Sequence, residues 1–230
     1  MAISYEPEDG NRPTSRTEYE RYRDKARELG FESMATAAAL SFELVQRVWD
    51  AFGIPDPALP AGARARLNKD RGIKWEDYRP GISITVRQSK TRKPITIPLF
   101  DVTGEGERIA LYPELEEQLS RVRPAQATGL IVVEERSGKP YKHRRMSTVH
   151  RQICDAAKLP KEMKFTGFRH GGATEIGDAG EADIRSISGH SQLNTAAIYN
   201  KASQEKARRI ARLRREHIAQ INAGEEELSE

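Results

Sequence analysis

The stretch from Phe168 to Lys201 reads FRHGGATEIGDAGEADIRSISGHSQLNTAAIYNK and decides how the rest of the chain is interpreted. It begins with an Arg-His pair at Arg169 and His170, continues to a Gly-His pair that ends in His190, and places Tyr199 nine residues later. Arginine makes bidentate contacts with phosphate oxygens, imidazole transfers protons near neutral pH, and a phenol can act as a nucleophile. These side chains therefore indicate chemistry at a phosphate group.

The same pattern resembles the C-terminal half of the tyrosine recombinase, or phage integrase, family. In that family an Arg-His pair opens one helix, a Gly-His pair opens the next, and a tyrosine nucleophile closes the pattern. The resemblance implies an α+β, mainly helical fold, in which a small antiparallel β-sheet lies at one edge of the catalytic domain. It also implies a site-specific recombinase or integrase that cuts and rejoins DNA strands through a 3′-phosphotyrosine intermediate, with no metal and no cofactor.

The resemblance extends to two more site residues. The family has a second arginine on an early helix, usually preceded by Gly or Gln and followed three residues later by an acid, and SFELVQRVWD fits with Arg47 and Asp50. A lysine on a β-hairpin turn protonates the 5′ hydroxyl leaving group in the family, and Lys90 in VRQSKTRKPITIPL stands where that role requires. His190 corresponds to the position beside the scissile phosphate, where it donates a hydrogen bond or handles the tyrosine proton.

One position departs from the family pattern. Three residues before Arg169 the family usually has His or Lys, and this chain has Thr166. Threonine can hydrogen-bond a phosphate oxygen but cannot act as a base near neutral pH. Thr166 and His170 are therefore two further candidate site residues: either His170 takes over the missing role, or catalysis is weaker than usual. His170 also has a structural interpretation, as a hydrogen-bond donor across the core.

Each of these residues also has an interpretation without function. Arg47 on an apolar helix fits a surface side chain whose stem packs on the helix. Lys90 fits an ordinary solvent-exposed lysine at a loop tip, and Tyr199 beside Ile198 fits a packed aromatic residue.

Basic residues gather in clusters, although the formal net charge is only +4. A sequence pI of about 9.2 is compatible with nucleic acid as a partner. Runs of charge are usually solvated faces, so the clusters gain weight only beside a site suited to DNA. The predicted DNA-binding residues are Arg64, Arg66, Lys69, Lys142, Arg144 and Arg145. A third basic cluster lies within residues 208–215.

Periodicity and turn residues predict the order of the elements. Residues 1–15 are polar and aperiodic and are expected to form a flexible N-terminal tail, the catalytic domain is expected over 16–222, and 223–230 form an acidic tail. Ser15 and Glu18 predict a capping box at the start of the first helix. The alternation of Ile82, Ile84 and Val86 with Ile95 and Ile97 predicts a hairpin. A strand is predicted over 130–133, and helices over 16–29, 34–52, 113–122, 146–157, 168–179, 183–188, 194–202 and about 203–222.

The C-terminal helix is basic and amphipathic, with an apolar stripe through Ile210, Leu213, His217 and Ile221. In the resembling family a C-terminal helix packs on a neighbouring protomer. The expected partners are therefore double-stranded DNA and further copies of the chain, as a tetramer on DNA assembled through this helix. The alternative is that the stripe packs on its own domain.

The composition limits the compartment. The chain of 230 residues has no apolar run long enough to span a membrane and no signal peptide, so we expect a soluble, cytoplasmic protein without a membrane partner. A single cysteine, Cys154, cannot form an intramolecular disulfide.

Two other functions remain open from the sequence. The first is a catalytically weakened DNA-binding protein derived from an integrase, which is supported by Thr166. It is also supported by the small space for the core-binding domain that normally precedes the catalytic domain; an excised domain, a truncated gene or a minimal recombinase would each explain that. The second is a type IB-like topoisomerase that uses the same chemistry.

Overall fold

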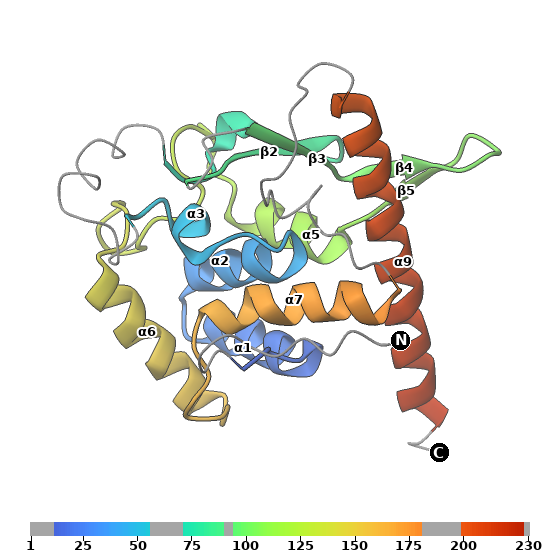
Figure 1. Ribbon diagram of the computed structural model, residues 1–230. Helices are drawn as coiled ribbons and strands as arrows, with labels where there is room; N and C mark the ends of the chain where they lie inside the picture. Colours follow the sequence, from blue (N-terminus) through green and yellow to red (C-terminus); the bar gives the residue numbers. More distant parts are fainter. Residues whose placement is uncertain (1–11, 56–70, 90–93, 181–198, 228–230) are drawn as a thin grey trace.

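The structure, a computed structural model, describes residues 12–55, 71–89, 94–180 and 199–227. Helices form most of the described part, and a small antiparallel sheet lies along one edge (Figure 1), as the sequence predicts. The α-helices are α1 (Arg16–Glu28), α2 (Glu32–Glu43), α3 (Val48–Phe52), α5 (Pro113–Val122), α6 (His143–Ala156), α7 (Thr166–Asp178) and α9 (Tyr199–Glu227). The strands are β1 (Tyr78–Arg79), β2 (Ser83–Arg87), β3 (Pro94–Pro98), β4 (Phe100–Val102) and β5 (Arg108–Ala110), and a 3₁₀ turn, η2, covers Trp75–Asp77.

Helix α1 begins where its capping box predicts. The Ser15 hydroxyl accepts a hydrogen bond from the Glu18 backbone N–H, and the Glu18 carboxylate accepts one from the Ser15 N–H. The residues just before this cap, within the segment predicted as a tail, also pack on the domain: Thr14 is 1% exposed and its N–H donates to the Gly167 carbonyl. Residues 1–11 of that segment lie outside the described residues.

Helix α2 is the centre of the core. It is rich in alanine, its residues from Ser33 to Glu43 are all buried, and it packs against α1, α5 and α7. Small side chains let neighbouring helices approach α2 on every side, which explains why so few large residues are needed there.

The predicted helix over 34–52 is wrong in its middle. The structure ends α2 at Glu43 and starts α3 at Val48. Val45 has a φ of 53°, in the left-handed region, and Arg47 is extended with a ψ of 145°. Periodicity could not reveal this break because the buried residues continue through it, and a β-branched residue is rarely left-handed.

The sheet confirms the predicted hairpin. Strands β2 and β3 pair in antiparallel register from Ser83 with Pro98 to Arg87 with Pro94, and Ile84, Val86 and Ile97 point into the core. The turn at 90–93, with Lys90, lies outside the described residues. The predicted strand at 130–133 is not a regular strand, because within the described chain it makes only an isolated bridge between Lys74 and Leu130.

Strands β4 and β5 are a hairpin that the sequence analysis missed. Their three-residue strands are too short to show alternation, and Figure 1 shows them projecting past α9. Three helices also begin earlier than predicted, α2 at Glu32, α6 at His143 and α7 at Thr166. The helix predicted over 183–188 lies outside the described residues.

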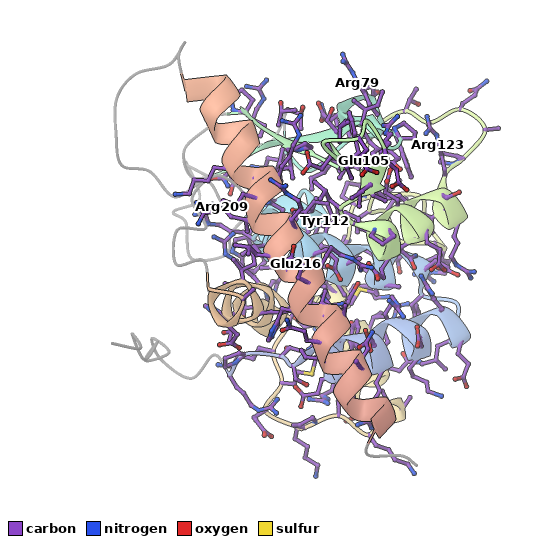
Figure 2. The ribbon with its side chains drawn as sticks, turned by 90° about the vertical axis from the view of Figure 1, so that its right-hand side faces the viewer. Arg79, Glu105, Tyr112, Arg123, Arg209 and Glu216 are labelled. Carbon is purple, nitrogen blue, oxygen red and sulfur yellow. The ribbon has the colours of Figure 1, made fainter. Side chains whose placement is uncertain are left out.

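Helix α9 is one continuous helix from Tyr199 to Glu227, and it packs on its own chain against α7 and β3. Figure 2 looks onto this helix, which crosses the domain with Arg209 and Glu216 along it. The predicted apolar stripe is rotated: Leu213, His217 and Ile221 are only partly buried. Within 206–223, where the side chains of α9 are described, the buried residues are Ala207, Ile210, Ala211, Arg214 and Ile218.

Two glycines let α7 lie directly against neighbouring backbone, Gly171 against Thr14 and Gly172 against the end of α2. A Cβ at Gly171 would collide with the Thr14 carbonyl oxygen, and a Cβ at Gly172 would collide with the carbonyl oxygen of Phe42. Backbone atoms cannot move aside as a flexible side chain can, so this packing requires glycine at both positions.

We predict that Gly172→Ala lowers the free energy of unfolding by about 2 kcal/mol or more, because α7 must move away from the end of α2. Gly177→Ala on the same helix is the matched control, since a Cβ there meets nothing within 4 Å. The control should be neutral or more stable by about 0.5 kcal/mol, because alanine favours a helix. Urea titrations of the three proteins measure the difference; equal stability of both variants would contradict the close approach.

Candidate active site

Arg47 lies in the break between α2 and α3, as the residue that precedes α3. Its side chain is 17% exposed, and its Nη1 lies 3.2 Å from the Gln88 Oε1 and 3.8 Å from the Asp50 Oδ2. The guanidinium is therefore held between α3 and the end of β2, and is not a freely solvated side chain.

Asp50 joins α3 to the strand that leads to Lys90. It is 2% exposed, and its Oδ1 accepts a hydrogen bond of 2.8 Å from the Ser89 backbone N–H. A carboxylate three residues after Arg47 is suited to orienting the guanidinium group. The distance of 3.8 Å between Arg47 and Asp50 is consistent with that role. Asp50 also has a second role, because its hydrogen bond to Ser89 connects the segment just before Lys90 to α3.

Arg169 lies in the first turn of α7 and reaches the same break. Its Nη1 donates a hydrogen bond of 2.7 Å to the carbonyl oxygen of Val45, two residues before Arg47. The structure thus brings the two predicted arginines, which are far apart in the sequence, to one short segment between α2 and α3.

Thr166 opens α7 and His170 lies one turn later, and both are partly buried. Burial, together with the charge of Arg169, lowers the pKa of His170 below its usual range. The neutral imidazole is therefore favoured near pH 7, and the same shift makes it a weaker base.

Several predicted site residues lie outside the described residues. They are Lys90, His190, Arg64, Arg66 and Lys69. Of Tyr199 the structure describes the backbone, which opens α9.

The remaining predicted DNA-binding residues lie at the start of α6. Lys142 and Arg144 are exposed, whereas Arg145 is partly buried and its Nε forms an ion pair of 2.9 Å with Glu134. The ring of His143 packs on Trp49 of α3, with 5.6 Å between the ring centroids. This contact places the basic start of α6 beside the helix that follows Arg47.

The sequence analysis missed Gln88 and Val45. Gln88 is 1% exposed, although it is polar and directly follows β2, and it contacts Arg47. A polar pair, Gln88 and Ser89, directly before the candidate Lys90 was the available signal. No comparable signal marks Val45, which takes part through its carbonyl oxygen.

Within the described ranges, no group of three or more His, Cys, Asp or Glu side chains could hold a metal ion. In the same part of the chain, no helix has both the length and the apolar surface that crossing a bilayer would require.

The model of the Phage integrase family matches residues 62–206, and the chain belongs to this family. A search of curated protein sequences finds no match. Among solved structures the chain is similar to the lambda integrase catalytic core, with 19% identity, a TM-score of 0.54, and coverage of 81% of this chain and 95% of that one. It is also similar to a lambda integrase (75–356) dimer bound to a COC′ core site, with 19% identity, a TM-score of 0.56 and coverage of 85% and 65%.

A third similar structure is the XerA recombinase, with 16% identity, a TM-score of 0.51 and coverage of 88% and 66%. The chain spans about half to two thirds of the length of the DNA-bound lambda integrase chains that it matches. At these identities the structures establish the fold, which is that of the integrase catalytic domain, as the sequence predicts.

We predict that Asp50→Ala lowers the free energy of unfolding by about 2–3 kcal/mol, because it leaves the Ser89 N–H without its acceptor and Arg47 without its carboxylate. Asp50→Asn keeps an acceptor for Ser89 and should cost less, about 1 kcal/mol. Asp155 is the control, because its side chain is 62% exposed and pairs with Arg151 on the surface of α6. Asp155→Ala should change stability by less than about 0.5 kcal/mol in the same urea titration. If Asp50→Ala is as mild as this control, Asp50 does not hold the two segments together.

Proposed function

We propose that the chain is a site-specific DNA recombinase that cuts and rejoins strands through a 3′-phosphotyrosine intermediate. The observation that carries the proposal is the convergence of Arg47 and Arg169 on one segment, in a chain that belongs to the phage integrase family. The proposal assigns the two guanidinium groups to the non-bridging oxygens of the scissile phosphate.

The surroundings of the two arginines suit this assignment. Negative charge develops on the phosphate oxygens in the transition state, and fixed donors stabilise it without reorganising during the reaction. Arg169 is anchored to the Val45 carbonyl, and Arg47 to Gln88 and Asp50, so each side chain is already oriented. Guanidinium groups have further N–H donors for a phosphate, in a fork that lysine lacks.

Tyr199 is the proposed nucleophile. Its phenol oxygen forms a bond to phosphorus while the bond from phosphorus to the 5′ oxygen breaks, so the energy of the phosphodiester is kept in the covalent link. In this proposal Lys90 protonates the departing 5′ oxygen, and His190 donates a hydrogen bond to the phosphate or takes the phenol proton. The reversal of these steps by a 5′ hydroxyl from another strand completes the exchange.

Thr166 and His170 are proposed as auxiliary residues. In this proposal Thr166 hydrogen-bonds a phosphate oxygen, and the imidazole of His170 supplies a proton acceptor that threonine cannot provide, although burial lowers its pKa. A catalytically weakened DNA-binding protein is the second candidate function, and the threonine in place of His or Lys is the observation that favours it.

Double-stranded DNA is the proposed partner. The exposed Lys142 and Arg144 would contact the backbone of the duplex beside α3, and Arg145 would first have to leave Glu134. Arg64, Arg66 and Lys69 are proposed for the same role. Contacts of this kind position the duplex and do not depend on its sequence.

A homo-oligomer on DNA is also proposed. Solved structures of the same fold include a lambda integrase dimer bound to a core site and a lambda integrase tetramer bound to a Holliday junction. If α9 assembles such a tetramer, it must leave its own domain and bury the same face on a neighbour, which is an exchange of identical contacts between copies.

We predict that the wild-type chain forms a covalent adduct with a pool of nicked duplexes of randomised sequence, and that Tyr199→Phe forms none. The short strand beyond the nick diffuses away after cleavage, so the covalent adduct cannot be reversed. The adduct is detected as a shifted band on a denaturing gel. Sequencing the attached DNA identifies the target site. The variant should retain DNA affinity, because only the phenol oxygen is removed. Binding without any adduct in the wild type would support the weakened DNA-binding protein, and an adduct in Tyr199→Phe would exclude Tyr199 as the nucleophile.

The assembly role of α9 is tested by a cross-link. Arg212 of α9 and Asp101 of β4 form an ion pair of 2.8 Å, so cysteines at these positions, in a Cys154→Ala background, report where α9 lies. With a short bis-maleimide the free protein should give a monomeric cross-link, and the protein assembled on its selected DNA site should give covalent dimers. A monomer locked by the cross-link should bind DNA but fail to recombine. Monomeric cross-links in complexes that still recombine would contradict the exchange; the single-cysteine proteins are the controls.

A further inference from the structure

Four charged side chains meet beneath α9, where solvent is excluded. Arg16, Glu43, Glu175 and Arg214 have side chains that are at most 8% exposed. Arg16 makes two bonds of 2.7 Å to Glu175 and lies 3.3 Å from Glu43, and Arg214 bonds Glu175 through Nε and lies 3.5 Å from Glu43. The four residues come from α1, α2, α7 and α9, so the cluster joins four helices.

Glu175 and Arg214 remain ionised despite their burial. Burial by itself would raise the pKa of Glu175, but the charges and hydrogen bonds of Arg214 and Arg16 outweigh burial and lower it to about 2. Burial likewise opposes the charge of Arg214, and Glu43 and Glu175 outweigh it and raise that pKa. The desolvation of buried ions offsets much of their attraction, so the cluster adds little to the free energy of unfolding. Its main effect is to fix how the four helices are arranged.

Arg214 differs from the other members because it also binds the backbone. Its Nη1 donates a hydrogen bond of 2.6 Å to the Glu43 carbonyl, and its Nη2 donates one of 3.2 Å to the Phe42 carbonyl. These carbonyls belong to the last turn of α2, where no intrahelical N–H is available to them. A cation at the end of a helix is also favoured by the helix dipole. Arg214 therefore caps α2 from α9.

The capped turn leads directly into the candidate active site. Two residues after Glu43, the Val45 backbone is left-handed and its carbonyl accepts the hydrogen bond from Arg169. Arg47 follows two residues later. The segment Phe42–Val45 is thus held at its start by Arg214 and at its end by Arg169. A left-handed β-branched residue persists only where the surroundings impose it, and these two arginines bond the backbone at Val45 and just before it.

We propose that Arg214 is a positioning residue, which shapes the segment Phe42–Val45 and thereby sets Arg47 and Arg169 for the phosphate. The inference rests on the proposed function. It adds that the phosphate site is correctly arranged only when α9 is packed on the end of α2. Arg214 lies about 22 Å along α9 from Tyr199, so it acts through the end of α2 and not by contact with DNA. Helix α9 begins with Tyr199. The helix that carries the proposed nucleophile therefore also carries the residue that positions Arg47 and Arg169.

The test compares Arg214→Lys and Arg214→Gln with Arg215→Lys and Arg215→Gln. Arg215 is the matched control: it is the next residue of α9, is partly exposed, and forms an ion pair of 2.6 Å with Glu114. Lysine at position 214 keeps the charge between the two carboxylates but cannot donate to two carbonyls and a carboxylate in the planar fork of arginine. A role limited to charge balance would be rescued by lysine, and the positioning role would not.

Single-turnover cleavage of the nicked duplex selected with the wild-type chain is the measurement. The amplitude of the cleavage reaction measures the fraction of protein that is folded and active. The rate constant reports how well the phosphate site is arranged. We expect Arg214→Lys to reduce the rate constant by roughly tenfold or more, because small displacements of positioning groups have effects of that size. Its amplitude and its DNA affinity should stay near wild-type values, and both Arg215 variants should cleave at the wild-type rate.

A second measurement isolates the arginine pair from the tyrosine. In a Tyr199→Phe background, hydrogen peroxide takes the place of the phenol: its oxygen bonds to phosphorus and the 5′ hydroxyl leaves. Arg214→Lys should reduce this peroxide-dependent cleavage by a factor similar to its effect on the tyrosine reaction. An undiminished peroxide rate would show that the arginine pair does not depend on Arg214 and would overturn the proposal.

The other decisive outcomes are equally distinct. A wild-type rate constant in Arg214→Lys, or a loss confined to amplitude, overturns the positioning role and leaves Arg214 as a structural residue. If Arg214→Gln does not fold, Arg214→Lys gives the same readout, since its charge balance is intact. The proposed function is judged separately by the adduct of the wild-type chain, so a failure of that function and a failure of this inference cannot be confused.

Discussion

The end of α2 is the constraint on which the rest of the structure depends. A buried helix must have partners for its last carbonyl groups, and here they come from side chains of distant elements. Arg214 of α9 donates hydrogen bonds to the carbonyl oxygens of Phe42 and Glu43, and Arg169 of α7 donates one to that of Val45. The close approach of α7 that makes this possible depends on Gly172, whose missing side chain leaves space for the Phe42 carbonyl. Satisfying the backbone thus brings together the helices that carry the candidate site.

The arrangement also explains why α3 is a separate short helix. If α2 continued through Arg47, the Val45 carbonyl would be engaged within the helix and would not be available to Arg169. The break turns the chain so that Asp50 reaches the Ser89 N–H and Arg47 reaches Gln88. The helical core and the sheet are therefore connected at the place where the candidate catalytic residues gather, and the connection is polar on both sides.

Charge is used in two ways in this protein. The cluster of Arg16, Glu43, Glu175 and Arg214 is buried and fully paired, and it orients four helices. The exposed Lys142 and Arg144, by contrast, are available to a polyanion, and their position beside α3 is what links them to the site. Helix α9 contributes Arg214 to the buried cluster, whereas its Arg212 and Arg215 pair with acids nearer the surface.

The sequence by itself determined the family, the mainly helical fold and the edge hairpin, because each of these depends on local pattern: the spacing of Arg169, His190 and Tyr199, the capping box at Ser15, and the alternation in β2 and β3. The resemblance to the family also singled out Arg47 and Asp50. Only the tertiary structure decided that α2 ends at Glu43, that Val45 is left-handed, and that the buried face of α9 includes an arginine. These features rest on contacts between residues more than a hundred positions apart, such as Arg214 with Glu43 and Arg169 with Val45. Periodicity reports whether a residue is buried, whereas the partner of a buried carbonyl or charge is set by how the elements pack.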